Sequence, residues 1–251
     1  MESFAAASQV YAGGLIFARV AAIVMLLPGI GDTSVPPRVR LAFAFLMALM
    51  LMPVVARGMP VPADVSGVAS AVIKELMIGL MIGGILKVFL SSLSTTGEII
   101  SIQTTLAFAQ TAAPGQASPS TTIGTFLGLI GITLIMVTDL HHMFLTAIVR
   151  SYAIFPFGRE IPIADSAQLA VQTVAGSFKL GLQMAAPVVV FSLVFNIAAG
   201  LVGRVMPQFQ VFFVATPLIV LLGLSVFALS LGTIGMVWLN RYRELTSLFL
   251  G

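Results

Sequence analysis

Long apolar stretches, interrupted by few charged residues, most constrain what this chain can fold into. A transmembrane helix needs about 20 mostly apolar residues, and six stretches reach or approach that length. They are Phe4–Leu27, Leu41–Ala56, Val65–Leu90, Ile123–Ile148, Leu180–Val202 and Val211–Leu239. Spans of this size would occupy roughly half of the chain and leave no room for a soluble domain. The sequence therefore predicts an all-α integral membrane protein with about six hydrophobic helical segments, in which residues 1–251 form a single membrane-embedded domain.

Composition supports this class and excludes several others. Hydrophobic residues make up 59% of the chain and charged residues only 8%, whereas a soluble domain carries roughly 25% charged residues. The chain has no cysteine, which excludes a disulfide framework, a Cys-type zinc site and thiol chemistry. Its net charge of +3 is scattered, so we expect no nucleic-acid partner. The sequence has no GxSxG, no HExxH and no Gly-rich loop ending in Lys-Ser/Thr, so we expect no catalytic site, no cofactor and no enzyme activity.

One basic residue, Arg19, lies inside the first apolar stretch. An arginine near the bilayer centre costs about 2.5–3.5 kcal/mol on insertion scales, and the apolar residues around it offset this cost. We therefore expect Arg19 to face protein or water rather than lipid. Its side chain either bonds to a buried partner or carbonyl, or takes part in a transport pathway, and the sequence leaves both open.

The third apolar stretch carries a polar or small residue at every fourth position. Glu75, Gly79, Gly83 and Lys87 share one slowly drifting face of the expected helix. The spacing of Gly79 and Gly83 is typical of a helix that another helix approaches closely. The acid and the lysine stand towards the ends of the stretch that suit the helix dipole. We expect these four residues to form a helix-packing face.

Asp139, His141 and His142 suggest a metal site or a proton relay. Adjacent histidines on a helix point about 100° apart and do not easily bind one ion, and no third ligand lies at a useful spacing. We therefore predict no metal site. The three residues are interpreted as a polar cluster at a helix end, with proton transfer as the alternative.

Two prolines, Pro187 and Pro217, lie inside apolar stretches. Proline is common in the first turn of a helix, and we expect both residues there. A pseudo-symmetric pair of helices is the alternative.

The loop Ser91–Thr122 is unusually poor in charge, because Glu98 is its only charged residue. Irregular backbone at membrane depth is tolerated only inside protein or along a water-filled cavity. The segment is therefore either an ordinary polar linker or a loop that enters and closes a pore. In the second case the candidate plug residues are Gln103, Phe108, Gln110, Pro114 and Gly115.

Short blocks along the chain form a pattern of fixed order and spacing. They are Phe17-Ala18-Arg19, Pro28–Gly31, Val35–Leu41, Lys74–Leu76 with Gly79 and Gly83, Gly97–Gln103, Leu140-His141, Ser151-Tyr152 with Phe155-Pro156 and Gly158, Ala186-Pro187, and Gly203–Phe212 ahead of Pro217-Leu218. Nearly end to end, this pattern resembles the FliR family of flagellar export-gate proteins, called SctT in virulence-type secretion systems. Two departures are Thr104 after the glutamine, where the family often has Gly, and Ala113-Pro114 in place of an Asp-Pro pair.

The resemblance implies a subunit of a helical export gate built with FliP-like and FliQ-like subunits, whose helices pack as hairpins. Such a gate passes unfolded flagellar proteins at the bacterial inner membrane, within the flagellar basal body and its ring, next to FlhB-like and FlhA-like export components. The resemblance also implies that the segment of about residues 103–122 plugs the closed channel. An SctT-type subunit of a virulence injectisome and a stand-alone small-molecule transporter remain the alternatives.

Overall fold

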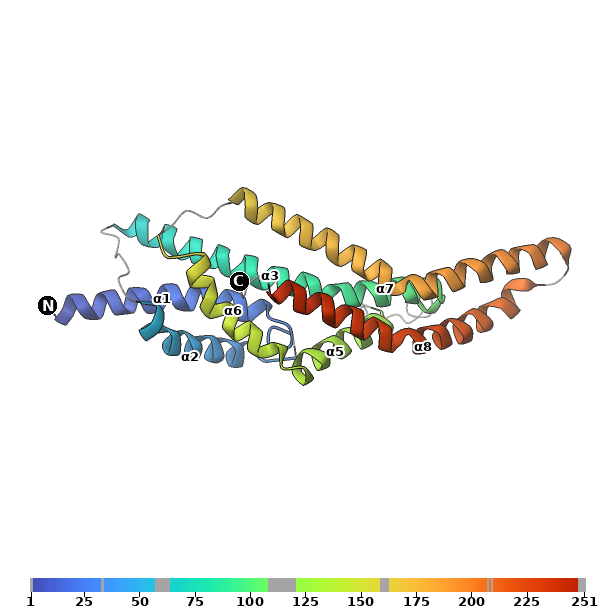
Figure 1. Ribbon diagram of the computed structural model, residues 1–251, viewed down its shortest axis with the longest axis horizontal. Coiled ribbons are helices and arrows are strands. Elements are labelled where there is room, and N and C mark those ends of the chain that lie inside the picture. Colours follow the sequence, from blue (N-terminus) through green and yellow to red (C-terminus); the bar gives the residue numbers. More distant parts are fainter. Residues whose placement is uncertain are drawn as a thin grey trace. The chain divides into compact units, whose positions relative to one another are not determined.

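The computed structural model describes residues 2–32, 34–56, 64–107, 121–158, 163–206, 208 and 210–247. These ranges are helical and contain no β-strand, which confirms the predicted all-α class. The helices, labelled in Figure 1, are α1 (Glu2–Leu26), α2 (Pro37–Val55), α3 (Val65–Gln103), α5 (Thr122–Val137), α6 (Leu140–Ile154), α7 (Ile163–Val205) and α8 (Val211–Ser247).

Five of these helices are long and apolar enough to cross a membrane, as judged by length and composition: α1, α2, α3, α7 and α8. The pair α5 and α6 adds a sixth span if the two helices are counted together. The chain is therefore an all-α membrane protein with the predicted number of hydrophobic segments.

The fourth apolar stretch is broken in the structure, and its prediction as one helix is wrong. α5 ends at Val137, α6 begins at Leu140, and Asp139 between them has left-handed backbone angles (φ 58°, ψ 16°). A left-handed residue does not continue a right-handed α-helix, so the chain changes direction here. Apolar composition alone did not reveal this break.

Two other expectations about helix ends are also wrong. α3 continues from the third apolar stretch to Gln103, so residues 91–103 are helical although they were expected in a loop. α7 begins at Ile163, which puts Pro187 deep inside a 43-residue helix rather than in its first turn. Prolines are tolerated in transmembrane helices because neighbouring groups satisfy the freed backbone carbonyls.

The chain divides into two compact units. The first unit takes its described residues from Met1–Phe89, Asp139–Val174 and Arg243–Gly251, and the second from Leu90–Thr138 and Ala175–Tyr242. α3, α7 and α8 contribute to both units, so each unit is described by itself below.

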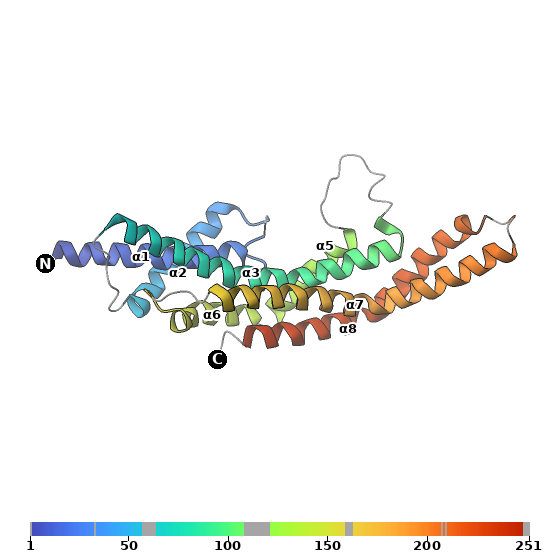
Figure 2. The ribbon, with the colours of Figure 1, turned by 90° about the horizontal axis from the view of Figure 1, so that it is seen from above.

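In the first unit, α1 and α2 form an antiparallel hairpin that is visible in Figure 2. The rings of Phe17 and Phe45 meet edge to face, with their centroids 6.0 Å apart. Gly29 has a positive φ of 84° in the turn between the helices, a conformation that glycine adopts without steric cost. α3 begins directly after Asp64. The Asp64 carboxylate accepts a hydrogen bond from the Ser66 hydroxyl, and this bond lowers the pKa of Asp64.

In the second unit, the C-terminal part of α3 packs against α5 through glycines. Gly97 and Gly124 are in backbone contact, and a side chain at Gly97 would collide with the α5 backbone. Trp238 of α8 is fully buried and contacts the α5 surface at Gly131. α7 and α8 run side by side as a long hairpin in this unit, as Figure 1 and Figure 2 both show.

Candidate functional site

The buried charge Arg19 lies in the first unit, where it forms a two-point ion pair with Glu75 of α3. Arg19 Nε lies 2.5 Å from Glu75 Oε2, and Nη2 donates to Oε1 at 3.0 Å. Arg19 is fully buried and Glu75 is 4% exposed. The planar guanidinium matches the carboxylate in a geometry that a lysine cannot reproduce. Each charge thus has the partner that an ionisable group needs inside an apolar segment.

The remaining N–H groups of Arg19 bind the C-terminal end of α6. Nη1 donates to the backbone oxygen of Ser151 at 3.0 Å and lies 3.4 Å from its hydroxyl oxygen. Nη2 also donates to the backbone oxygen of Phe155 at 2.9 Å. An arginine side chain has five N–H donors, and these contacts together with Glu75 use all of them. One side chain therefore connects α1, α3 and α6.

Two aromatic rings cover this ion pair. The Arg19 guanidinium carbon lies 4.1 Å from the centroid of the Tyr152 ring and 5.4 Å from that of Phe157. Both distances are within the range of cation–π attraction. The Tyr152 hydroxyl donates to the backbone oxygen of Ile16 at 3.4 Å, which holds the ring against α1. We call Arg19, Glu75, Ser151, Tyr152, Phe155 and Phe157 the Arg19 cluster.

Close packing of α1 and α3 continues beside this cluster at two glycines. A Cβ atom at Gly79 would lie 2.6 Å from the Ala22 Cβ, and one at Gly83 would lie 2.9 Å from the Leu26 Cβ. Both distances are shorter than real side-chain contacts, so only glycine permits this approach of the two helices. Glu75, Gly79 and Gly83 therefore all face α1.

Lys87, the fourth residue of the expected packing face, is exposed instead. Each step of four residues turns an α-helix about 40° beyond a full turn, so three steps carry Lys87 about 120° away from Glu75. The dipole argument also fails, because both charges lie well inside a helix that runs from Val65 to Gln103.

Of the candidate plug residues, the structure describes Gln103, while Phe108, Gln110, Pro114 and Gly115 lie outside the described residues. Gln103 is the last residue of α3, and its side-chain oxygen accepts a hydrogen bond from the Ser192 hydroxyl of α7 at 2.7 Å. The sequence singled out Gln103 but gave no signal that would identify its partner on α7.

The two residues after Gln103 have distinct environments. Thr104 is fully buried, and a Cβ atom at Gly223 of α8 would lie 2.6 Å from its methyl group. Thr105 has a positive φ of 62° and ends the helix. The start of the candidate plug segment, about residues 103–122, is thus held between α7 and α8 of the second unit.

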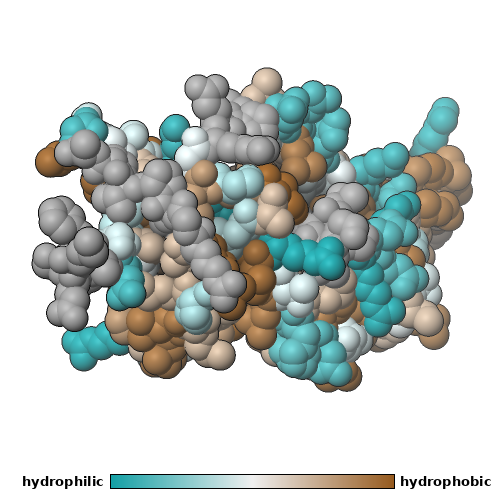
Figure 3. All heavy atoms as spheres, turned by 60° about the vertical axis from the view of Figure 1, so that its left-hand side comes forward, coloured by the Kyte–Doolittle hydropathy of each residue, from teal (hydrophilic) through white to brown (hydrophobic). Residues whose placement is uncertain are grey.

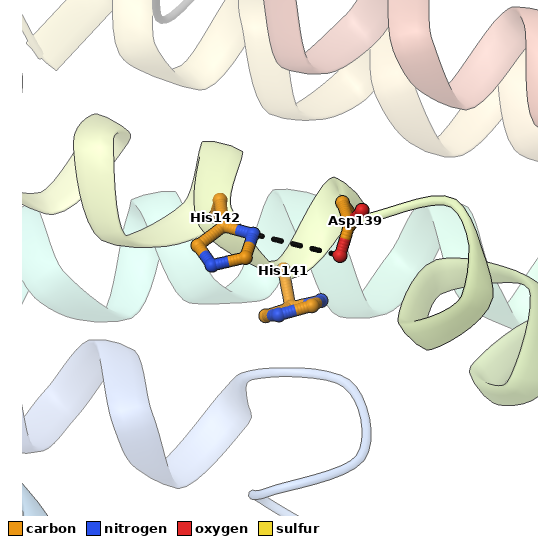
Figure 4. A group of neighbouring side chains, drawn as sticks. All are labelled: Asp139, His141 and His142. Atoms are coloured by element: carbon orange, nitrogen blue, oxygen red, sulfur yellow. Dashed lines mark ion pairs between the residues drawn. The ribbon is translucent and has the colours of Figure 1, made fainter.

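The polar residues Asp139, His141 and His142 lie close together at the start of α6 (Figure 4). The two imidazole ring centroids are 4.1 Å apart, and His142 Nδ1 lies 3.7 Å from Asp139 Oδ1. One ligand atom from each of the three residues lies within 4.8 Å of the others. The expectation that adjacent histidines point apart and lack a third donor is therefore wrong for this site.

This geometry does not by itself define a metal centre. The side chains of Asp139 and His142 are 78% and 68% exposed, and exposed pairs of this kind contribute little binding energy. Asp139 makes no side-chain capping bond, but its carboxylate stands at the N-terminal end of α6, where it suits the helix dipole. We interpret the three residues as a polar cluster at a helix end.

Comparison with known proteins assigns the family. The model of a family described as bacterial export proteins, family 1, matches residues 10–245 of this chain. The flagellar biosynthetic protein FliR of Caulobacter vibrioides is 60% identical over 250 residues, which are 99% of this chain and 100% of the relative. FliR of Escherichia coli K12 is 29% identical over 84% of this chain and 80% of its own. FliR of Bacillus subtilis is 27% identical over 81% of this chain and 80% of the relative. On this similarity, which extends from before Arg19 to the last turns of α8, the chain belongs to the FliR family of bacterial export proteins.

Proposed function

We propose that this chain is a membrane subunit of the flagellar type III export gate, and that with FliP-like and FliQ-like subunits it forms a channel for unfolded flagellar proteins. Its family supports the export role, because the relatives are named flagellar biosynthetic proteins. The 60% identity to a flagellar relative over its whole length favours this system over an SctT-type injectisome. The proposal assigns both compact units, residues 1–251, to one export-gate domain.

The observation that carries the proposed assembly is the apolar surface of α7 and α8. Large apolar side chains are exposed along α7 from Phe178 to Val205 and along α8 from Phe213 to Val237. At 1.5 Å per residue, the stretch on α7 is about 40 Å long, whereas the hydrocarbon core of a bilayer is about 30 Å thick. Lipid tails cover a helix of this length only where it tilts strongly, whereas apolar helices of other subunits cover it along its whole length. Apolar side chains are visible at the surface as brown spheres in Figure 3.

The distribution of charge argues against a stand-alone small-molecule transporter. Arg19 and Glu75, the two buried charges of the described residues, bind each other and leave no donor of Arg19 for a substrate. Residues 180–203 of α7 and 211–240 of α8 contain no charged side chain at all. Polar substrates are normally bound at charged or broken segments near the membrane midplane. A structural subunit that packs against other helices fits this pattern better.

The proposal places the chain in the bacterial inner membrane, within the flagellar basal body. FlhB-like and FlhA-like export components, the basal-body ring and the exported unfolded proteins are its further partners in this setting. These assignments follow from the family alone.

We further infer that the segment of about residues 103–122 closes the channel of the assembled gate. Glu98 is the only charged residue from Ser91 to Thr122, so this segment can enter a narrow channel without the cost of burying a charge. Phe108 supplies bulk for occlusion, Gln103 and Gln110 supply polar contacts, and Pro114-Gly115 supplies a turn. The fixed positions of Gln103 and Thr104 between α7 and α8 give the segment a firm base.

Co-expression tests the assembly. The full chain with an affinity tag is produced alone and together with FliP-like and FliQ-like subunits from the same bacterium. We expect the tagged chain to retain both subunits and to become monodisperse only in their presence, since its apolar faces are then covered. Equal yield and monodispersity without the partners contradicts the proposal.

Deletion of Ala107–Pro114 tests the closing role. We expect the deleted chain to assemble with its partners and to let ions or small solutes leak into cells, measured as conductance or solute uptake. An assembled gate that stays as tight as the parent shows that another segment forms the seal.

A further inference from the structure

A groove between α1 and α2 in the first unit is separate from the features assigned above. It encloses about 490 Å³, and its walls include Val10, Gly14 and Phe17 of α1 and Phe45, Leu49 and Met52 of α2. This volume lies in the range of small-ligand sites, roughly 300–1,000 Å³. A Cβ atom at Gly14 would have no neighbour within 4 Å among the described residues, so the groove is open at this position.

The face of α2 that lines the groove also carries an arginine, Arg38. Arg38, Phe45 and Met52 are spaced seven residues apart, close to two helical turns, and therefore share one face of α2. The helical rise puts Arg38 about 10 Å from Phe45 and about 21 Å from Met52 along the axis. Arg38 is exposed and makes no hydrogen bond or ion pair to the part of the chain that the structure describes.

A second arginine and the helix terminus add positive potential at the same end of α2. Arg40 donates from Nη1 to the Gly31 backbone oxygen at 3.1 Å, but its Nε is buried and has no hydrogen-bond partner in the described part of the chain. α2 has neither an acidic residue in its first turn nor a side-chain cap. The N-terminal end of a helix attracts anions. Asp32 is the one acid between α1 and α2, where it accepts a hydrogen bond from Gly29 N at 3.2 Å, and the two arginines leave a net positive charge at this end of α2.

We propose that this groove binds an anionic phospholipid, whose phosphate lies at Arg38 beside the N-terminal end of α2 and whose acyl chain lies along the groove between α1 and α2. A phospholipid combines a negative headgroup with a long apolar chain, as the arrangement of arginines and apolar walls requires. A wholly apolar helix from a partner subunit would cover the apolar walls but would leave the Arg38 guanidinium without a counter-charge. The lipid therefore satisfies both parts of the site.

Lipid titration of the purified full chain in detergent tests the charge at the site. Phosphatidylglycerol and phosphatidylcholine with the same acyl chains are added separately, and bound lipid is counted by native mass spectrometry. We expect phosphatidylglycerol to bind at least about tenfold more tightly, because each basic residue near an anionic lipid favours binding about fivefold. Arg38→Gln should weaken phosphatidylglycerol binding about fivefold, while Arg204→Gln, a control in the second unit, should leave it unchanged. Equal binding of the two lipids, or no effect of Arg38→Gln, overturns the proposal.

A second pair of variants tests the groove itself. Gly14→Phe fills the groove and should reduce the binding of both lipids. Gly84→Phe on α3 is the matched control, since a Cβ atom there also has no neighbour within 4 Å in the described chain. Equal lipid binding by Gly14→Phe and Gly84→Phe shows that the lipid binds elsewhere.

The absence of natural cysteine allows a direct test of the occupant in the assembled gate. Gly14→Cys places the only thiol of this chain in the groove. We expect a maleimide-bearing phospholipid to label it in membranes that contain the complete complex. A cross-link from Gly14→Cys to a partner subunit, with no lipid adduct, identifies a protein helix as the occupant and overturns the proposal.

Discussion

The guanidinium of Arg19 and the carboxylate of Glu75 face each other in a two-point contact, although 56 residues separate them in the sequence. Removing one partner of a buried pair leaves an uncompensated charge, which costs about 3–5 kcal/mol. We therefore expect Arg19→Met alone, or Glu75→Met alone, to lower the thermal stability of the purified chain strongly.

The double variant Arg19→Met/Glu75→Met should lose less stability than the sum of the two single variants, because no lone charge remains. Thermal unfolding followed by circular dichroism measures all four proteins of this cycle. Strictly additive losses would mean that the two charges act independently, against the contact seen in the structure.

The packing of α1 on α3 predicts opposite outcomes at two adjacent glycines. Gly83→Leu forces a side chain into the contact with Ile23 and Leu26, and such overpacking costs about 1–3 kcal/mol. Gly84→Leu adds the same side chain where a Cβ atom has no neighbour within 4 Å in the described chain. Gate assembly on a native gel and swimming motility should fall for the first variant and persist for the second. Equal behaviour of the two would contradict close packing at Gly83.

The base of the proposed plug offers a similar comparison. Gly223→Val should displace Thr104, since a Cβ atom at residue 223 would lie 2.6 Å from the Thr104 methyl group. We expect this change to loosen the base of the segment and raise solute uptake in cells with an assembled gate. Gly232→Val on the same helix is the control, because a Cβ atom there meets no described residue within 4 Å. A gate that leaks equally in both variants points to a general weakening of α8.

The break between α5 and α6 predicts that glycine at position 139 preserves stability better than alanine does. The left-handed backbone of Asp139 (φ 58°) costs an ordinary residue about 1–2 kcal/mol but costs glycine little. Asp139→Gly should therefore retain the stability of the parent within a few tenths of a kcal/mol, whereas Asp139→Ala should lose about 1 kcal/mol or more. Thermal unfolding distinguishes these cases. An Asp139→Ala variant that is as stable as the parent or more stable than Asp139→Gly would contradict the left-handed conformation.

The sequence predicted the elements that depend on local composition. The apolar stretches identified the membrane helices, and the spacing of Gly79 and Gly83 identified a close helix contact, because both signals repeat along one segment. The continuation of α3 to Gln103 was missed, since threonine, serine and glycine lower helix propensity while packing in the second unit sets the helix end.

The partners of the site residues were less predictable than the residues themselves. Arg19 and Glu75 were each recognised as charges in apolar surroundings, but their pairing depends on how α1 and α3 meet. Ser151 and Phe155 belong to the recognised sequence blocks, but their contact with Arg19 was not predicted. They bind it through backbone oxygens, which every residue has, so the residue type does not reveal the contact. An alternating or helical pattern reports which face of a segment is buried, not which atoms lie opposite it.

The order of Arg19 and its partners along the chain has a consequence for biosynthesis. Glu75 follows 56 residues later and Ser151 follows 132 residues later, so a ribosome adding about 5–20 residues per second needs about 3–11 s to make the carboxylate partner after Arg19. During that interval, α1 carries a guanidinium without the carboxylate that binds it in the folded chain. The order of synthesis thus leaves the guanidinium of one nascent helix without its carboxylate until the third helix is made.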